Sequence, residues 1–215
     1  MKGKVFFITG IDTNIGKTFI TGIWAKQLAN TGHKVITQKM VQTGCLERSE
    51  DIEEHRHLQG LPYLPEDEMG LTCPYIFTYP CSPHMAAEKD KRIIDTKLIT
   101  QATNKLREKY EIVLLEGAGG LMVPIDHKQL TIDYLKECNY PVVLVTSGRL
   151  GSINHTILSL EACLCREISV YSVVYNNYPP ADESIDLNTR AYIKEYLQRK
   201  SPETLFQVFD KGFLK

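Results

Sequence analysis

The chain has 215 residues, and its 25 lysines and arginines against 26 aspartates and glutamates give a formal net charge of −1. Hydrophobic residues make up 43% and charged residues 24%, a mixture typical of a folded globular protein rather than a disordered one. The sequence has no cluster of positive charge of the kind that binds nucleic acid, so we expect no nucleic-acid partner. No apolar run approaches the ~20 residues needed to cross a bilayer, so we expect no membrane contact. We expect one cytoplasmic domain over residues 1–215.

Short apolar runs of strand length alternate along the chain with longer segments of helical spacing. The expected strands are Lys4–Thr9, Lys34–Gln38, Glu111–Leu115, Val142–Thr146 and Val170–Tyr175. The expected helices are Lys17–Thr31, Asp51–Gln59, Asp95–Tyr110, Leu130–Cys138, Ser152–Arg166 and Leu187–Arg199. Residues 60–83 hold five of the ten prolines, which predicts a loop with one edge strand there.

This alternation of strands and helices predicts an α/β fold. Strand–helix–strand order builds a mostly parallel sheet, and the connecting helices cover both of its faces. Ligands of such sheets bind beyond the carboxyl ends of the strands. Chemically active residues are therefore expected at those ends.

The segment Gly10-Ile-Asp-Thr-Asn-Ile-Gly16-Lys17-Thr18 joins the first expected strand to the first expected helix. It is a variant P-loop, with five residues instead of four between the outer glycine and the Gly-Lys pair. Backbone N–H groups at such a helix start bind phosphate oxygens, Lys17 brings positive charge to them, and the Thr18 hydroxyl suits Mg²⁺. A glycine-rich turn that only caps the helix is the alternative, and the flanking strand and helix favour nucleotide binding.

Further polar residues follow the next strands. Lys39 ends the second strand and precedes Thr43-Gly44, while Asp51 begins the next helix. Glu116 ends the third strand, where it resembles the acidic residue on the metal side of P-loop ATPases. On local grounds Lys39 is equally a solvated strand-end lysine, and Asp51 an ordinary helix N-cap.

Two more segments at strand ends have both a binding and a structural interpretation. The run Gly117–Gly120 lets backbone N–H groups approach phosphate or substrate, or it simply makes a turn. Asn176-Asn177 offers amide donors and acceptors that suit a purine edge. Equally, these asparagines are turn residues before Pro179-Pro180.

Taken together, these segments resemble the dethiobiotin synthetases, over the chain from Val5 to about Pro180. The matching segments are FITGIDTNIGKT, the K-x-V-Q-T-G strand end, SPHMAA, VLLEGAGGLMVPI and LGSINHTILSLEA. The resemblance implies an ATP-dependent cyclo-ligase that closes the ureido ring of dethiobiotin from 7,8-diaminononanoate, CO₂ and MgATP. It also implies that a substrate amine takes up CO₂ as a carbamate, which ATP converts to a carbamic–phosphoric anhydride.

The resemblance further implies roles for individual residues. It also implies a homodimer, in which the helix start at residues 151–154 of one subunit receives the tail of the substrate bound to the neighbouring subunit. The implied catalytic residues are Lys39 and Lys17, and the implied Mg²⁺ ligands are Thr18, Asp51 and Glu116. The implied nucleotide-binding residues are Asn14, Ile15, Gly16, Lys17, Thr18, Phe19, Asp51, Glu116, Gly117, Ala118, Gly119, Asn176 and Asn177. The implied substrate-binding residues are Thr43, Gly151, Ser152, Ile153 and Asn154.

Some residues depart from this pattern or compete with it. Met40 stands where the family commonly has proline, and Leu205–Val208 replaces a Gly-x-Ile-Pro segment, which leaves base specificity open. We expect His84 and His155 to serve packing rather than catalysis, since the implied chemistry needs no histidine base. The rival classes are a partitioning-type ATPase switch, an amidotransferase-type ligase and a nucleotide-binding subunit without catalysis.

Overall fold

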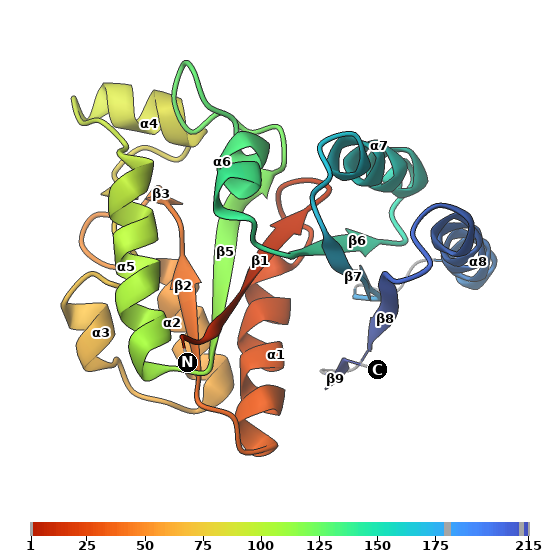
Figure 1. Ribbon diagram of the computed structural model, residues 1–215, viewed down its shortest axis with the longest axis horizontal. Helices are drawn as coiled ribbons and strands as arrows, with labels where there is room; N and C mark the ends of the chain where they lie inside the picture. The colour runs from red at the N-terminus through yellow and green to blue at the C-terminus, as the bar shows by residue number, and fades with distance from the viewer. Residues whose placement is uncertain (1, 179–181, 211–212, 215) are drawn as a thin grey trace.

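The computed structural model describes residues 2–178, 182–210 and 213–214, and its centre is a twisted sheet with helices on both faces (Figure 1). Seven strands within the described residues lie side by side in the order β2 (Val35–Lys39), β5 (Ile112–Gly120), β1 (Lys4–Gly10), β6 (Val142–Ser147), β7 (Val170–Asn176), β8 (Leu205–Asp210) and β9 (Phe213–Leu214). Neighbouring strands run parallel, except that β9 is antiparallel to β8. The predicted mostly parallel α/β fold is therefore confirmed.

The helices divide between the two faces of this sheet. They are α1 (Lys17–Asn30), α2 (Glu50–Gln59), α3 (Pro65–Glu68), α4 (Pro83–Lys89), α5 (Thr96–Lys109), α6 (Thr131–Cys138), α7 (Ser152–Leu164) and α8 (Glu183–Lys200). Buried residues of α5, α6, α7 and α8 share one hydrophobic core with the sheet, and those of α1 share the other.

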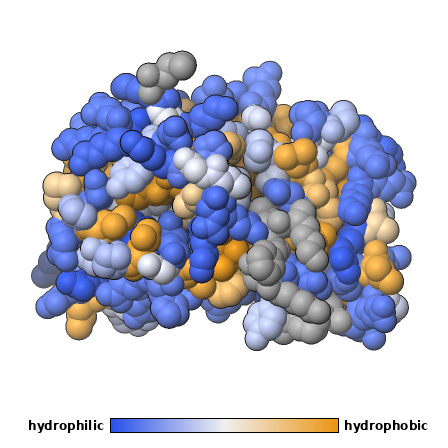
Figure 2. Space-filling model, turned by 90° about the horizontal axis from the view of Figure 1, so that it is seen from below, coloured by the Kyte–Doolittle hydropathy of each residue, from blue (hydrophilic) through white to orange (hydrophobic). Residues whose placement is uncertain are grey.

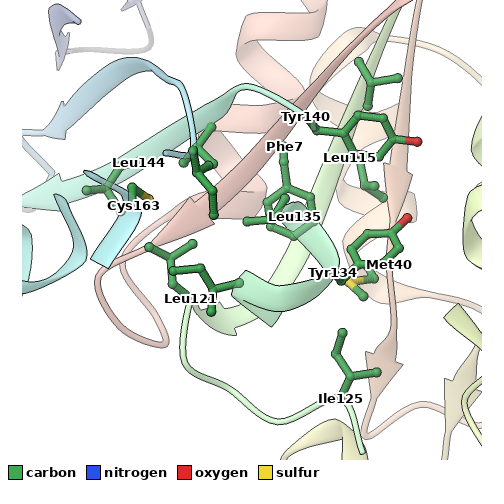
Figure 3. Packing of buried hydrophobic residues seen from close by; sticks show 14 of the residues in the cluster. Phe7, Met40, Leu115, Leu121, Ile125, Tyr134, Leu135, Tyr140, Leu144 and Cys163 are labelled. Atoms are coloured by element: carbon green, nitrogen blue, oxygen red, sulfur yellow. The ribbon is translucent and has the colours of Figure 1, made fainter. Parts of the chain in front are cut away.

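Alternation along the central strands supplies both cores, because successive side chains of a strand point to opposite faces. Phe7 and Leu115 belong to the first core, and their neighbours Ile8 and Leu114 to the second. Figure 3 shows Phe7 and Leu115 of the sheet close to Leu135 of α6 in the first core. The continuous apolar runs in the sequence are thus strands buried on both sides.

The face of the molecule seen from below is mostly hydrophilic, with hydrophobic residues in separate groups (Figure 2). Across the described ranges, no helix has both the length and the apolar character that a membrane crossing requires.

The structure departs from the prediction mainly where elements are short or partly exposed. Residues 60–83 contain α3 and β4 (Ile76–Phe77), which pairs in parallel with β3 (Gln42–Thr43) in a second small sheet, and α4 begins at their end. Elements this short carry no periodic apolar pattern. Strand β8 was not predicted because its residues are mostly half-buried. Helix α8 starts earlier than expected, since the Asp182 side chain accepts N–H bonds from Ser184 and Ile185.

Candidate active site

The phosphate loop leaves β1 and enters α1 in a conformation that needs glycine. Gly16 has a φ of 93°, and a Cβ there would lie 2.4 Å from Nδ2 of Asn176. Asn176 ends β7 and donates this same Nδ2–H to the carbonyl oxygen of Ile15 over 3.0 Å. In the described structure no side chain caps α1, so the N–H groups of its first turn are available to an anion.

Lys17 lies beneath this loop with its ammonium group buried. Its Nζ donates to the carbonyl oxygen of Asp12 over 3.0 Å. Burial, followed by the positive charge of Lys39, lowers the pKa of Lys17 from 10.5 to about 8. A bound phosphate would favour the charged form again, because an anion stabilises a neighbouring ammonium group.

Parallel pairing of β2 with β5 places Lys39 beside Glu116, since these two residues are partners in the strand register. Lys39 Nζ donates to Glu116 Oε1 over 2.8 Å and to the Gly117 carbonyl oxygen over 3.2 Å, and it also forms an ion pair with Asp51. Only 5% of Lys39 is exposed, so the interpretation as a solvated strand-end lysine is wrong.

The charges of this cluster stabilise one another against the cost of burial. Burial alone would lower the pKa of Lys39, but Glu116 and Asp51 outweigh it and raise that pKa above its ordinary value. Burial alone would likewise raise the pKa of Glu116, but Lys39 and a bond from His55 hold it well below its ordinary value. Glu116 is therefore a carboxylate at neutral pH, although it is completely buried.

Asp51 reaches the cluster from α2 because another residue caps that helix. The N-cap is Ser49, whose Oγ accepts the N–H of Ile52 over 3.2 Å, so the N-cap interpretation of Asp51 is wrong. The Thr18 hydroxyl lies 3.1 Å from Asp51 Oδ1 and 3.0 Å from Glu116 Oε1. A hydroxyl has one proton, so it can donate to only one of these carboxylates at a time.

These oxygens fit a divalent cation by their chemistry. Thr18 Oγ1, Asp51 Oδ1 and Glu116 Oε1 converge at one point beside the phosphate loop. Mg²⁺ prefers such hard oxygen ligands and usually binds one or two carboxylates together with substrate phosphates. Among the described residues, no group of three or more histidines, cysteines or acidic residues could hold a metal ion.

A cleft of about 800 Å³ opens over the phosphate loop and the charged cluster, and residues 80–83 form part of its wall. The predicted site residues that line it are Asn14, Gly16, Lys17, Thr18, Phe19, Lys39, Thr43, Asp51, Glu116, Ala118 and Gly119. Lys17 and Lys39 thus face one shared cavity rather than separate regions.

The remaining residues predicted for the nucleotide lie around this cleft without lining it. Ile15 is buried in the hydrophobic core, and Gly117 allows the Phe7 ring to approach, since a Cβ there would lie 2.7 Å from it. Asn176 uses Nδ2 on the phosphate loop, and its Oδ1 accepts the N–H of Tyr178 over 3.1 Å. The backbone N–H of Asn177 donates to the carbonyl oxygen of Phe209. Base contacts for these asparagines remain a prediction.

The segment predicted to bind the substrate tail lies elsewhere on the same chain. Gly151, Ser152 and Ile153 line a second cavity of about 440 Å³ between the start of α7 and residues of α8. Asn154 follows them within α7. The structure therefore does not bring residues 151–154 into the phosphate cleft of their own chain.

Sequence reasoning missed two polar contacts at this site. His55 is fully buried on α2, and its Nε2 lies 2.9 Å from Glu116 Oε2. It follows Asp51 by four residues, so the helical spacing already placed both on one face. Arg149 forms an ion pair with Asp12 of the phosphate loop. His84, which we expected to serve packing, lies edge-on against the ring of His127.

Comparison with solved structures shows which fold this chain has. The signal recognition particle receptor FtsY from Elizabethkingia anophelis, in complex with GDP, has a TM-score of 0.58 at 14% identity and covers 100% of this chain and 60% of its own. A putative plasmid partition protein from Borrelia burgdorferi, bound to AMPPNP, has a TM-score of 0.58 at 14% identity, over 98% of this chain and 88% of its own. These likenesses show the fold alone. With the phosphate loop, they define a P-loop NTPase fold, and a family model described as an AAA domain matches residues 4–205.

Sequence relatives then identify the family. An ATP-dependent dethiobiotin synthetase, BioD 2, from Pasteurella multocida is 55% identical over 207 residues, which cover 96% of this chain and 97% of that protein. A second ATP-dependent dethiobiotin synthetase, from Chlorobaculum tepidum, is 52% identical over 199 residues, covering 93% of this chain and 83% of that protein. The chain belongs to the ATP-dependent dethiobiotin synthetases, a family of ligases in biotin biosynthesis.

Proposed function

We propose that this chain closes the ureido ring of dethiobiotin from 7,8-diaminononanoate, CO₂ and MgATP in the cytoplasm. The observation that supports this most strongly is the placement of Lys39, whose ammonium is held between Glu116 and Asp51 at a cleft that Lys17 also lines. A phosphoryl acceptor that is itself an anion needs such cationic screening next to the γ-phosphate.

The reaction proceeds in three chemical steps. One substrate amine adds to CO₂ and loses a proton, which gives a carbamate. A carbamate oxygen attacks the γ-phosphorus, and ADP leaves with the electron pair of the broken P–O bond. The second amine then attacks the carbonyl carbon of the anhydride and loses a proton, phosphate leaves with the electron pair of the broken C–O bond, and the ring closes. Phosphorylation is needed because a carbamate is a poor electrophile until its oxygen becomes part of a good leaving group.

The two lysines, Lys17 and Lys39, have different electrostatic roles in this reaction. Lys17 binds the β- and γ-phosphates together with the backbone of residues 14–19, and Gly117–Gly119 lies along the same phosphates. Lys39 lies beside the carbamate and screens its charge from the γ-phosphate, and the Thr43 hydroxyl contacts the substrate. Asn176 and Asn177 contact the adenine. The Asn176 amide keeps one N–H and one oxygen lone pair beyond those used by Ile15 and Tyr178.

Thr18, Asp51 and Glu116 would hold Mg²⁺, which when bound neutralises charge on the phosphates as they approach the carbamate. Since Lys39 contacts both carboxylates, its ammonium offsets one of their two negative charges even before the metal binds. Positioning of the reacting groups in one cleft supplies much of the remaining rate enhancement.

The second cavity supports a homodimer as the working form. Residues Gly151–Asn154 form the start of α7, where backbone N–H groups suit a carboxylate. They lie outside the phosphate cleft of their own chain, so we propose that they bind the carboxylate tail of the substrate held by a partner subunit.

The experiment that tests this function follows dethiobiotin formation by mass spectrometry. We expect product only when 7,8-diaminononanoate, bicarbonate, ATP and Mg²⁺ are all present, and no product when any one is omitted. Phosphate release that continues at the same rate without the diamine or bicarbonate would instead support an ATPase switch.

A further inference from the structure

The buried histidine on α2 contacts the acidic centre of the active site. His55 has no exposed surface, and its Nε2 lies 2.9 Å from Glu116 Oε2. Glu116 is ionised and can only accept, so the ring must donate its Nε2–H. The other oxygen of the same carboxylate, Oε1, lies 2.8 Å from Lys39 Nζ and 3.0 Å from the Thr18 hydroxyl. The two oxygens of Glu116 therefore have separate partners.

The fold brings this histidine close through a glycine in the middle of α1. A Cβ on Gly22 would lie 2.7 Å from Leu58 Cδ1 and 3.3 Å from the Cα of His55. Glycine weakens a helix interior, so a close approach of the two helices accounts for its presence there. Helix α2 thus lies near enough to α1 for the imidazole ring to reach Glu116 in β5.

The ring is not placed there by packing needs alone. Among the described residues Nδ1 of His55 has no hydrogen-bond partner, although it is buried. A buried polar atom without a partner costs stability, and an apolar residue of similar size would avoid that cost. Residues that break such a rule are expected where a site requires them.

We propose that His55 is a positioning residue that holds Glu116 by Oε2, so that Oε1 stays beside Thr18 and remains available to a divalent cation. This inference rests on the metal site of the proposed function. Hydrogen bonds to a ligating carboxylate fix its orientation, and their loss typically weakens metal affinity by about 10–100-fold. Without the histidine, Oε2 would be a buried carboxylate oxygen with no donor, and the group would turn toward Lys39 or Thr18 to find one.

The test compares variants that differ in reach rather than in polarity. In His55→Gln the longer amide can place an N–H near the position of Nε2, whereas in His55→Asn the shorter amide cannot. His57→Gln is the matched control, since His57 is exposed on the same helix. We would measure Mn²⁺ binding in the presence of ADP by electron paramagnetic resonance, ADP binding without metal by calorimetry, and folding by thermal melts.

We expect His55→Asn to weaken Mn²⁺ binding by about 10–100-fold, with metal-free ADP binding nearly unchanged, and His55→Gln to stay within about threefold of the wild type. Equal Mn²⁺ affinity in wild type and both variants would overturn the positioning role alone. If His55→Asn and His55→Gln lose Mn²⁺ affinity equally, and in proportion to the fall in their melting temperatures, His55 has a packing role and the positioning role is overturned. Wild-type protein that does not bind Mn²⁺ with ADP would overturn the proposed metal site together with this inference.

Discussion

Replacing Lys39 with methionine removes the charge at the centre of the site while keeping most of the side-chain volume. Lys39 is 5% exposed and neutralises a carboxylate, Glu116, that has no contact with solvent. Breaking a buried ion pair by removing one partner typically costs about 3–5 kcal/mol, because the other charge is left uncompensated. A chain of this size loses roughly 2–4 °C of melting temperature per kcal/mol, so we expect Lys39→Met to melt about 6–20 °C lower at pH 7.

The same substitution should reduce turnover far more than nucleotide binding. Loss of one group that stabilises developing charge typically lowers kcat by about 10²–10³-fold. Lys17 and the loop backbone remain, so ADP should still bind. Dethiobiotin formation by mass and ADP binding by calorimetry measure the two effects. Lys34→Met is the matched control, since Lys34 is exposed just before the same strand and should change stability by less than about 0.5 kcal/mol.

The stability difference between wild type and Lys39→Met should depend on pH. In the wild type the pKa of Glu116 is depressed below its ordinary 4.5, so its contribution is present above pH 4.5 and is lost as the pH falls through the lower folded value. The raised pKa of Lys39 means that its contribution is present below 10.5 and is lost only as the pH rises through the higher folded value. Without the ammonium, burial raises the pKa of Glu116, so the difference should narrow as the pH falls from 7 toward 4.5. Equal melting temperatures of Lys39→Met and wild type at pH 7, or a turnover of the variant near the wild-type rate, would contradict this role of Lys39.

Two further predictions concern other parts of the site. Lys17, with a pKa of about 8, should take up a proton when nucleotide binds at pH 9, and calorimetry in buffers of different ionisation enthalpy detects this uptake. The variant Lys17→Met should show no proton uptake, and an uptake that persists in the variant would mean that another group binds the proton. Gly22→Ala should lower the free energy of unfolding by about 1–3 kcal/mol, measured by chemical denaturation, because the added methyl group would collide with Leu58. An increase of ~1 kcal/mol, as expected from helix propensity alone, would mean that α1 and α2 can move apart without cost.

The sequence was informative where function depends on contiguous residues. The phosphate loop is one uninterrupted segment between a strand and a helix, and the sequence predicts both this strand and this helix. Lys39 and Glu116 could be expected near each other because the sequence predicts each at the end of a parallel strand. In the structure β5 continues past Glu116 to Gly120, and the strand register makes the two residues partners. Their mutual charge compensation could not be predicted, since it depends on how deeply both are buried.

The contacts that escaped prediction depend on packing between distant elements. The bond from His55 to Glu116 joins residues 61 positions apart, and it forms only because α2 lies close to α1 at Gly22. The bond from Asn176 to Ile15 spans 161 positions and links the residue expected to contact the base to the phosphate loop. Neither contact leaves a local pattern, because each follows from the three-dimensional placement of side chains that are ordinary within their own segments.

Transfer of oxygen from bicarbonate to phosphate is the most direct test of the central claim, that a carbamate is phosphorylated in this cleft. With ¹⁸O-labelled bicarbonate, mixed rapidly with enzyme, diamine and MgATP before exchange with water, the carbamate oxygen that attacks the γ-phosphorus leaves with phosphate when the ring closes. We expect phosphate that carries one ¹⁸O atom for each dethiobiotin formed. Dethiobiotin accompanied by unlabelled phosphate would show that ATP is cleaved by water or another acceptor, and would contradict this claim.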